Sequence, residues 1–205
     1  GALYALDLQT DAVGVVDIQL GFATDMGPGS GSSPALSLSA EMVYVSDEDG
    51  LFYAVNARSG EIAWQVQTRV GAAAAAVGAD GTIYALQIQA PALVTISPEG
   101  DIRWESDLDE LARKTLPSSW LLGDPIAVGN GNPTVLKDSV VVPVLYGYEI
   151  SLGKPILLPV ISTLVAIDLE TGEGLCNVLT LRDDSAGVTA VLPDGTIINS
   201  LAAMS

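Results

Sequence analysis

The sequence AVNARSGEIAW at residues 54–64 decides the fold. Its apolar residues, the Ser59-Gly60 pair and the closing Trp64 predict the end of one strand, a tight turn and a second strand. The same hairpin recurs in three further places: ALDLQTD at 5–11, TISPEG at 95–100 with Trp104 after it, and AIDLETG at 166–172. Copies of one hairpin along a chain indicate a repeat protein.

The spacing of these copies predicts a β-propeller. A period of roughly 40–50 residues with four strands per unit is typical of propeller blades. We therefore expect an all-β propeller of four-stranded antiparallel blades, with about four blades in this chain. Residues 1–205 form one such domain or part of a larger ring. The expected units are about 1–20, 34–68, 70–106, 133–180 and 187–205, with an insertion at 105–133.

The two ends of the chain complement each other in this scheme. Residues 1–20 are expected to supply the last two strands of a blade, and residues 187–205 the first two. Three arrangements are open: a compact ring, two chains joined into a larger ring, or a piece of a longer propeller. Gly1 stands directly before strand-like sequence, so we expect a processed product or a fragment.

The charge of the chain restricts its partners. There are 25 acidic residues against 8 basic ones, which gives a formal net charge of −17 at pH 7. Such a chain repels phosphate backbones and anionic bilayers, so we expect neither nucleic-acid binding nor membrane insertion. The longest apolar run, residues 155–167, is too short to span a bilayer and is interrupted by Pro159.

Two residue types that often carry chemistry are nearly missing. The chain has one cysteine, Cys176, and no histidine. An internal disulfide, a zinc cluster of thiolates and a histidine proton relay are therefore excluded. We identify no catalytic residue, and we expect a protein that is not an enzyme.

The turn DEDG at 47–50 contains weak candidates for a metal site. Calcium binds carboxylate oxygens from such loops, which makes Asp47 and Asp49 the residues to consider. The ligand alternation of a dedicated calcium loop is absent, however, and related turns recur as ADG at 79–81 and PDG at 193–195. Recurrence favours hairpin formation as the role of these residues, so we predict no metal site.

Two segments depart from the simple repeat. Residues 107–116 place acids first and bases last, which predicts a short helix because the helix dipole favours that order. The insertion that contains this helix and Trp120 is either a specific contact surface or a decoration of the fold. The alanine run at 72–76 is flanked by glycine, and we expect a short inner strand with small side chains.

The repeat resembles the tryptophan-docking motif Ala-x-Asp-x-x-Thr-Gly-x-x-x-Trp of the pyrroloquinoline quinone (PQQ, quinoprotein)-like β-propellers. The second unit matches this motif with Ala54, Asn56, Ser59, Gly60 and Trp64.

The other units match the motif less completely. In the first unit Asp11 takes the glycine position and Val15 the tryptophan position; in the fourth, Cys176 takes the tryptophan position. In the third unit the tryptophan comes one residue early. The resemblance implies that five residues dock each blade on the next: Trp64, Trp104, Gly60, Gly100 and Gly172.

The resembled family includes both enzymes and scaffolds. Its alcohol and sugar dehydrogenases hold PQQ and calcium at the ring centre, whereas its outer-membrane assembly propellers have no catalytic role. The vicinal cysteine pair and the histidine base of those enzymes cannot be present here. No residue of this chain can be matched to a cofactor-binding position.

The resemblance therefore implies a non-catalytic secreted or periplasmic propeller, a scaffold for protein binding or assembly. A protein partner or self-association is expected, in the periplasm or outside the cell. The alternatives are part of a PQQ- and calcium-dependent dehydrogenase whose catalytic residues lie outside this chain, and a structural module of a surface or filament protein.

Overall fold

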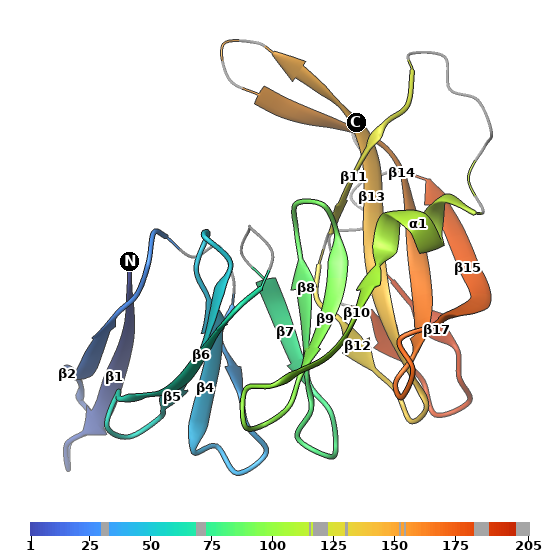
Figure 1. Ribbon diagram of the computed structural model, residues 1–205. Helices are drawn as coiled ribbons and strands as arrows, with labels where there is room; N and C mark the ends of the chain where they lie inside the picture. The colour runs from blue at the N-terminus through green and yellow to red at the C-terminus, as the bar shows by residue number, and fades with distance from the viewer. Residues whose placement is uncertain are drawn as a thin grey trace.

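The computed structural model consists of antiparallel sheets that lie side by side (Figure 1). We call this row of sheets the fan. The structure describes residues 1–29, 33–68, 73–114, 116, 123–129, 131–151, 153, 155–182 and 189–199. The predicted all-β architecture with four-stranded antiparallel sheets is confirmed; the described residues form two four-stranded sheets, one five-stranded sheet and two hairpins. Among the described residues, no helix is both long and apolar enough to cross a bilayer.

The first sheet is a hairpin of β1 (Ala2–Thr10) and β2 (Val16–Asp25). Strand β2 extends past residue 20, the expected end of the first unit, and continues to Asp25. The turn also differs from the prediction, because Gly14 and not Asp11 adopts the left-handed conformation, with a φ of 87°. The Asp11 carboxylate instead accepts hydrogen bonds from the backbone N–H groups of Val13 and Val15, at 2.8 and 2.9 Å.

The next two sheets have four strands each, in sequence order. The first contains β3 (Ala35–Leu36), β4 (Met42–Ser46), β5 (Leu51–Asn56) and β6 (Ile62–Gln67). The second contains β7 (Ala73–Val77), β8 (Ile83–Gln87), β9 (Ala92–Ile96) and β10 (Ile102–Asp107). The alanine-rich strand β7 lies at one edge of this sheet and pairs with β8.

The fourth sheet is the largest and departs most from the repeat. Its strands are β11 (Ile126–Gly129), β12 (Thr134–Val135), β13 (Ser139–Ser151), β14 (Pro155–Asp168) and β15 (Gly174–Arg182). The expected insertion therefore contributes a strand, since β11 pairs with β13. The predicted helix is present as α1 (Leu108–Arg113), shorter than expected, with Asp107 as its N-cap.

A last hairpin, β16 (Ala190–Val191) and β17 (Ile197–Ile198), forms a separate two-stranded sheet. Its turn repeats that of β7 and β8, because the N–H of Gly195 donates to Leu192 as that of Gly81 does to Gly78. In the described part of the chain the first and last hairpins do not pair with each other. A composite blade made from the two ends is thus not formed within this chain.

The core lies between successive sheets. Strand β8 shows this best, since all five of its residues are buried. Ile83 and Ala85 pack toward the sheet before it, while Tyr84 and Leu86 pack toward the sheet after it. A strand that is covered on both faces carries a continuous apolar run, which is why IYAL has no polar alternation.

Candidate functional site

Trp64 of β6 lies across the turn between β9 and β10 of the following sheet. Its Nε1 donates a hydrogen bond of 2.9 Å to the carbonyl of Pro98. Its indole covers Gly100, where an added Cβ would come within 2.8 Å of Cδ2. The other neighbours are Tyr44 and Phe52, with ring centroids at 5.9 and 6.4 Å. The glycine is required here by close approach as well as by its φ of 98°.

Trp104 of β10 repeats this arrangement one sheet further on. Its Nε1 donates to the carbonyl of Leu169 at 3.2 Å, and a Cβ at Gly172 would lie 2.7 Å from its Cε3. The hydroxyl of Ser106, two residues after the tryptophan, donates to the Gly172 carbonyl. Residues far apart in sequence are therefore joined by the same set of contacts at two successive turns.

Phe22, and not Val15, takes the aromatic position in the first unit. A Cβ at Gly60 would come 2.6 Å from the Phe22 ring, while Val15 is 62% exposed at the hairpin turn. The hydroxyl of Thr24 donates to the Gly60 carbonyl at 2.6 Å. The prediction for Val15 is wrong because it aligned Asp11 with the glycine of the turn, which placed the whole unit out of phase.

A sequence signal for Phe22 exists and was missed. An aromatic residue is followed two positions later by a hydroxyl residue in both Phe22-x-Thr24 and Trp104-x-Ser106. Those hydroxyls make the same contact with a turn glycine carbonyl. In the second unit the residue two positions after Trp64 is Val66, which has no hydroxyl, so this unit does not show the pattern.

The Asp or Asn of the motif closes its own turn. Asn56 Oδ1 accepts from the N–H groups of Arg58 and Ser59 at 2.9 and 3.0 Å. Asp168 Oδ1 accepts from Glu170 and Thr171 at 3.0 and 2.9 Å. These hydrogen bonds, first those from Thr171, lower the pKa of Asp168 below its ordinary value. The motif acid therefore serves the turn.

The structure does not bring Asp47 and Asp49 together as metal ligands. Asp47 is buried, and its two carboxylate oxygens accept hydrogen bonds from the Tyr53 hydroxyl at 2.7 Å and the Leu51 N–H at 2.9 Å. Burial, followed by the bond to Asp47, raises the pKa of Tyr53 and keeps it a donor. Asp49 is exposed in the same turn.

The described residues do not offer the ligands that calcium needs. Those residues contain no group of three or more His, Cys, Asp or Glu side chains that could hold a metal ion. The most buried carboxylate of the acidic turn already uses both oxygens within the protein. Hard cations such as calcium require several free oxygen ligands. We therefore derive no chemistry through such a cofactor.

The helix of the insertion is tied to the fourth sheet by one charged network. Asp109 receives two hydrogen bonds from Arg113, at 3.0 and 3.1 Å, and one of 2.9 Å from the Tyr146 hydroxyl. The guanidinium also lies 5.4 Å from the Tyr146 ring centroid. Burial, ahead of the bond to Asp109, raises the pKa of Tyr146, which keeps the phenol neutral and able to donate.

The side chains of two residues considered in the sequence analysis, Trp120 and Cys176, lie outside the described part of the structure. Trp120 lies outside the described residues. Cys176 is in β15, where the backbone is described and the side chain is not.

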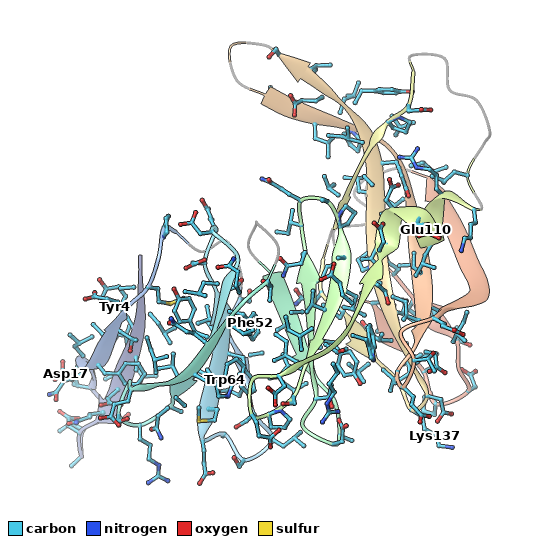
Figure 2. The ribbon with its side chains drawn as sticks, in the orientation of Figure 1. Tyr4, Asp17, Phe52, Trp64, Glu110 and Lys137 are labelled. Atoms are coloured by element: carbon cyan, nitrogen blue, oxygen red, sulfur yellow. The ribbon has the colours of Figure 1, made fainter. Side chains whose placement is uncertain are left out.

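The first hairpin carries a set of exposed apolar side chains on one side. Cross-strand partners Leu6 and Leu20, and Leu8 and Ile18, share one side of this hairpin. The opposite side packs on the next sheet through Leu3 and Phe22. We name the open side the hairpin face, and its side chains are 57% to 70% exposed: Tyr4, Leu6, Leu8, Val16, Ile18 and Leu20. Figure 2 shows Tyr4 at the end of the fan far from Lys137.

Comparison with known proteins identifies the family. The profile of the family described as outer membrane protein assembly factor BamB matches residues 25–200. The chain belongs to this family. The resemblance to PQQ-like repeats is thereby confirmed. Among proteins of curated function, none matches the sequence.

Solved structures show the same fold at low identity. A europium-containing methanol dehydrogenase is 18% identical with a TM-score of 0.55, over 79% of this chain and 27% of its own. Quinohemoprotein alcohol dehydrogenase ADHIIG from Pseudomonas putida HK5 is 16% identical with a TM-score of 0.53, over 83% of this chain and 28% of its own. BamB from Moraxella catarrhalis is 11% identical with a TM-score of 0.48, over 97% of this chain and 74% of its own.

These matches separate fold from activity. The BamB-family chain spans 28% and 27% of the two dehydrogenases, so it corresponds to only part of either enzyme. The TM-scores of 0.53 and 0.55 show a common β-propeller fold, at sequence identities of only 16% and 18%. A shared fold hosts many functions, and the site has to carry the functional argument.

Proposed function

We propose that this chain is a non-catalytic propeller scaffold that binds protein through the hairpin face, in the periplasm or outside the cell. The observation that carries the proposal is the hairpin face itself, an apolar surface with side chains at least 57% exposed. The family supports it, since its description is that of an outer-membrane protein assembly factor. Contiguous exposed apolar patches mark protein interaction sites.

The occupant that fits this face best is a second copy of the chain. The two-stranded sheet has no further strand on either edge among the described residues, and an isolated hairpin gains stability from added strands. A net charge of −17 opposes contact between like chains. The side chains of the hairpin face are themselves uncharged, and salt screens the repulsion between the acidic residues around them. Nucleic acid stays an unsuitable partner on the same charge argument.

The second candidate is part of a PQQ- and calcium-dependent dehydrogenase. The shared fold of two quinoprotein dehydrogenases supports it. It requires catalytic residues outside this chain, because the described residues offer no carboxylate cluster for calcium. A third candidate, a module of a surface or filament protein, uses the hairpin face to build extended assemblies instead of closed ones.

Dye reduction separates the first two candidates. The purified chain is supplied with PQQ and calcium, and reduction of an electron-acceptor dye is followed with alcohols and sugars as substrates. We expect no reduction above the protein-free rate and no retention of PQQ after dialysis. Quinone retained at one equivalent per chain, with substrate-dependent reduction, would refute the scaffold proposal. Electron microscopy of the same sample would reveal filaments if the third candidate holds.

A further inference from the structure

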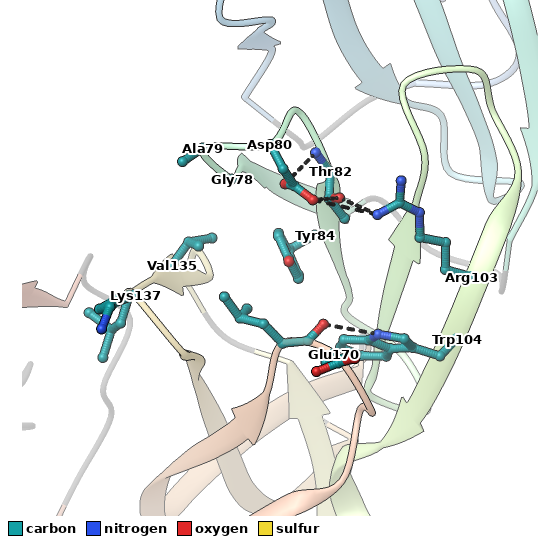
Figure 3. Close-up of a pocket in the computed structure, with 12 residues that line it drawn as sticks. Gly78, Ala79, Asp80, Thr82, Tyr84, Arg103, Trp104, Val135, Lys137 and Glu170 are labelled. Atoms are coloured by element: carbon teal, nitrogen blue, oxygen red, sulfur yellow. Dashed lines mark hydrogen bonds and ion pairs between the residues drawn. The ribbon is translucent and has the colours of Figure 1, made fainter.

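A cavity of about 590 Å³ lies between the β7–β10 sheet and the fourth sheet (Figure 3). Its volume falls in the range of small-molecule sites, which is roughly 300–1,000 Å³. Its walls come from the β7–β8 turn, from β10, from the segment after β12 and from the β14–β15 turn. The cavity is therefore built by four segments that only the folded fan brings together.

Tyr84 forms the floor of this cavity with an unused hydroxyl. The residue is only 3% exposed, yet its hydroxyl makes no hydrogen bond with any described residue. The buried hydroxyls of Tyr53 and Tyr146 each have a carboxylate partner. In Figure 3 the Tyr84 ring stands between the Asp80–Arg103 group and Glu170. This hydroxyl is not one of the fully buried unpaired polar atoms of the described residues, so it faces the open space of the cavity and can form a hydrogen bond with a molecule bound there.

Two of the eight basic residues of the chain, Arg103 and Lys137, line the cavity from opposite sides (Figure 3). Lys137 is 92% exposed and lies 3.9 Å from Asp138, so Arg103 is the stronger candidate for an anion. Arg103 uses Nη1 for Thr82 Oγ1 at 2.6 Å and lies 3.6 Å from Asp80. Its Nε and Nη2 donors make no hydrogen bond within the described part of the chain. A guanidinium with two free parallel donors matches the geometry of a carboxylate.

The acids of the cavity limit the charge of a ligand. Asp80 accepts from the Thr82 N–H and hydroxyl, at 3.0 and 2.7 Å, and is neutralised by Arg103. Glu170 lies at the rim opposite. Two acids against two bases disfavour a polyanion such as a phosphate, while a single carboxylate adds only one charge. The apolar walls from Trp104, Leu136 and Leu169 suit a hydrocarbon body.

The equivalent Tyr–Trp pair one sheet earlier has no arginine beside it. Tyr44 is also 3% exposed and lies beside Trp64, as Tyr84 lies beside Trp104. The residue before Trp64, however, is Ala63, where Arg103 precedes Trp104. The repeat therefore needs no arginine to pack, and Arg103 has a role specific to this cavity.

We propose that the Tyr84 cavity binds a small organic monocarboxylate with an apolar or aromatic body. The carboxylate lies on Arg103, the body lies against Trp104 and Leu136, and the Tyr84 hydroxyl completes the polar contacts. This site is independent of the hairpin face, so either proposal can fail without the other.

Three probes with one body and different charge test the proposal: phenylacetate, phenylacetamide and phenethylamine. Saturation-transfer NMR on the whole chain is expected to show phenylacetate binding roughly tenfold more tightly than the amide, with the amine weakest. Arg103→Ala, which copies Ala63, should remove the difference between the first two. Tyr84→Phe should weaken phenylacetate roughly threefold to tenfold, since one hydrogen bond is lost.

Tyr44→Phe is the matched control and should leave binding unchanged, because Tyr44 packs beside Trp64 as Tyr84 does beside Trp104 but does not line the cavity. Circular dichroism checks that every variant is folded. Equal binding of the three probes by the unmodified chain would overturn the proposal, as would no saturable binding at millimolar concentrations. Equal effects of Tyr84→Phe and Tyr44→Phe would overturn the role of the Tyr84 hydroxyl.

Discussion

At the scale of single residues, Gly100 and Gly14 can be compared because they have similar backbone conformations in different surroundings. Both are left-handed, with φ of 98° and 87°, but only Gly100 is covered by an indole. An added Cβ would meet Trp64 at 2.8 Å in the first case and nothing within 4 Å in the second. Comparing the two alanine variants therefore isolates the contact between sheets from the strain of the backbone.

We predict that Gly14→Ala lowers the unfolding free energy by about 1–2 kcal/mol through left-handed strain alone. Gly100→Ala should cost about 1–3 kcal/mol more, because the indole has to move. Urea denaturation measures both. Equal losses for the two variants would show that Trp64 does not hold the sheets together, and the proposed docking role of the motif would fall.

The motif acid gives a prediction on pH. The folded-state pKa of Asp168 is lowered from 3.8 by hydrogen bonds from Thr171 and Glu170, so its carboxylate stabilises the folded state above that pH. The contribution is lost as the pH falls through the lowered folded-state value. Asn56 makes the same turn contacts with an amide, so Asp168→Asn should keep the fold without titrating.

The difference in Tm between the unmodified chain and Asp168→Asn should consequently be largest above about pH 5 and shrink below it. Thermal unfolding at a series of pH values measures this difference, and taking a difference cancels the titration of the other acids. A difference that stays constant with pH would contradict the assignment of Asp168 as a turn-stabilising carboxylate.

At the scale of elements, the first unit provides a test of the corrected alignment. Phe22 is half-buried against Gly60, while Val15 is 62% exposed. We predict that Phe22→Ala costs about 2–4 kcal/mol, somewhat below the range for a fully buried aromatic. Val15→Ala should stay within about 0.5 kcal/mol of the unmodified chain. The reverse order in urea denaturation would restore Val15 to the tryptophan position.

The strands and the turn glycines could be predicted because they depend on local chemistry. Gly60, Gly100 and Gly172 all have positive φ, as turns of this kind require. The motif placed the glycine position of the first unit at Asp11. In the structure Asp11 accepts hydrogen bonds within the turn, and the left-handed glycine is Gly14, three residues later. The motif letters do not distinguish these two roles.

Contacts made by segments outside the repeat could not be predicted from the sequence. Strand β11 pairs with β13 across an insertion that has no repeat counterpart, so no periodicity indicated it. The Tyr84 cavity depends on four separate segments, and the only sequence signal was Arg103 at a position where the neighbouring unit has Ala63. Such departures from a repeat are where function is expected.

At the scale of the whole molecule, the fan combines a strongly acidic chain with one open apolar end. The net charge of −17 causes electrostatic repulsion between copies of the chain over most of their surface. The hairpin face is the exception, because Leu6, Leu8, Ile18 and Leu20 meet solvent on a sheet whose opposite side is packed. Binding of protein at this face is the central claim of the proposed function.

Sedimentation equilibrium at physiological ionic strength tests that claim most directly. The unmodified chain is predicted to form a particle whose mass is a multiple of 21.1 kDa, and Leu8→Glu with Ile18→Glu should return it to 21.1 kDa. Gln9→Glu with Gln19→Glu adds the same charge to the opposite side of the same hairpin and should leave the assembly intact. An unmodified chain that sediments at 21.1 kDa, or equal disruption by both pairs, would contradict the account.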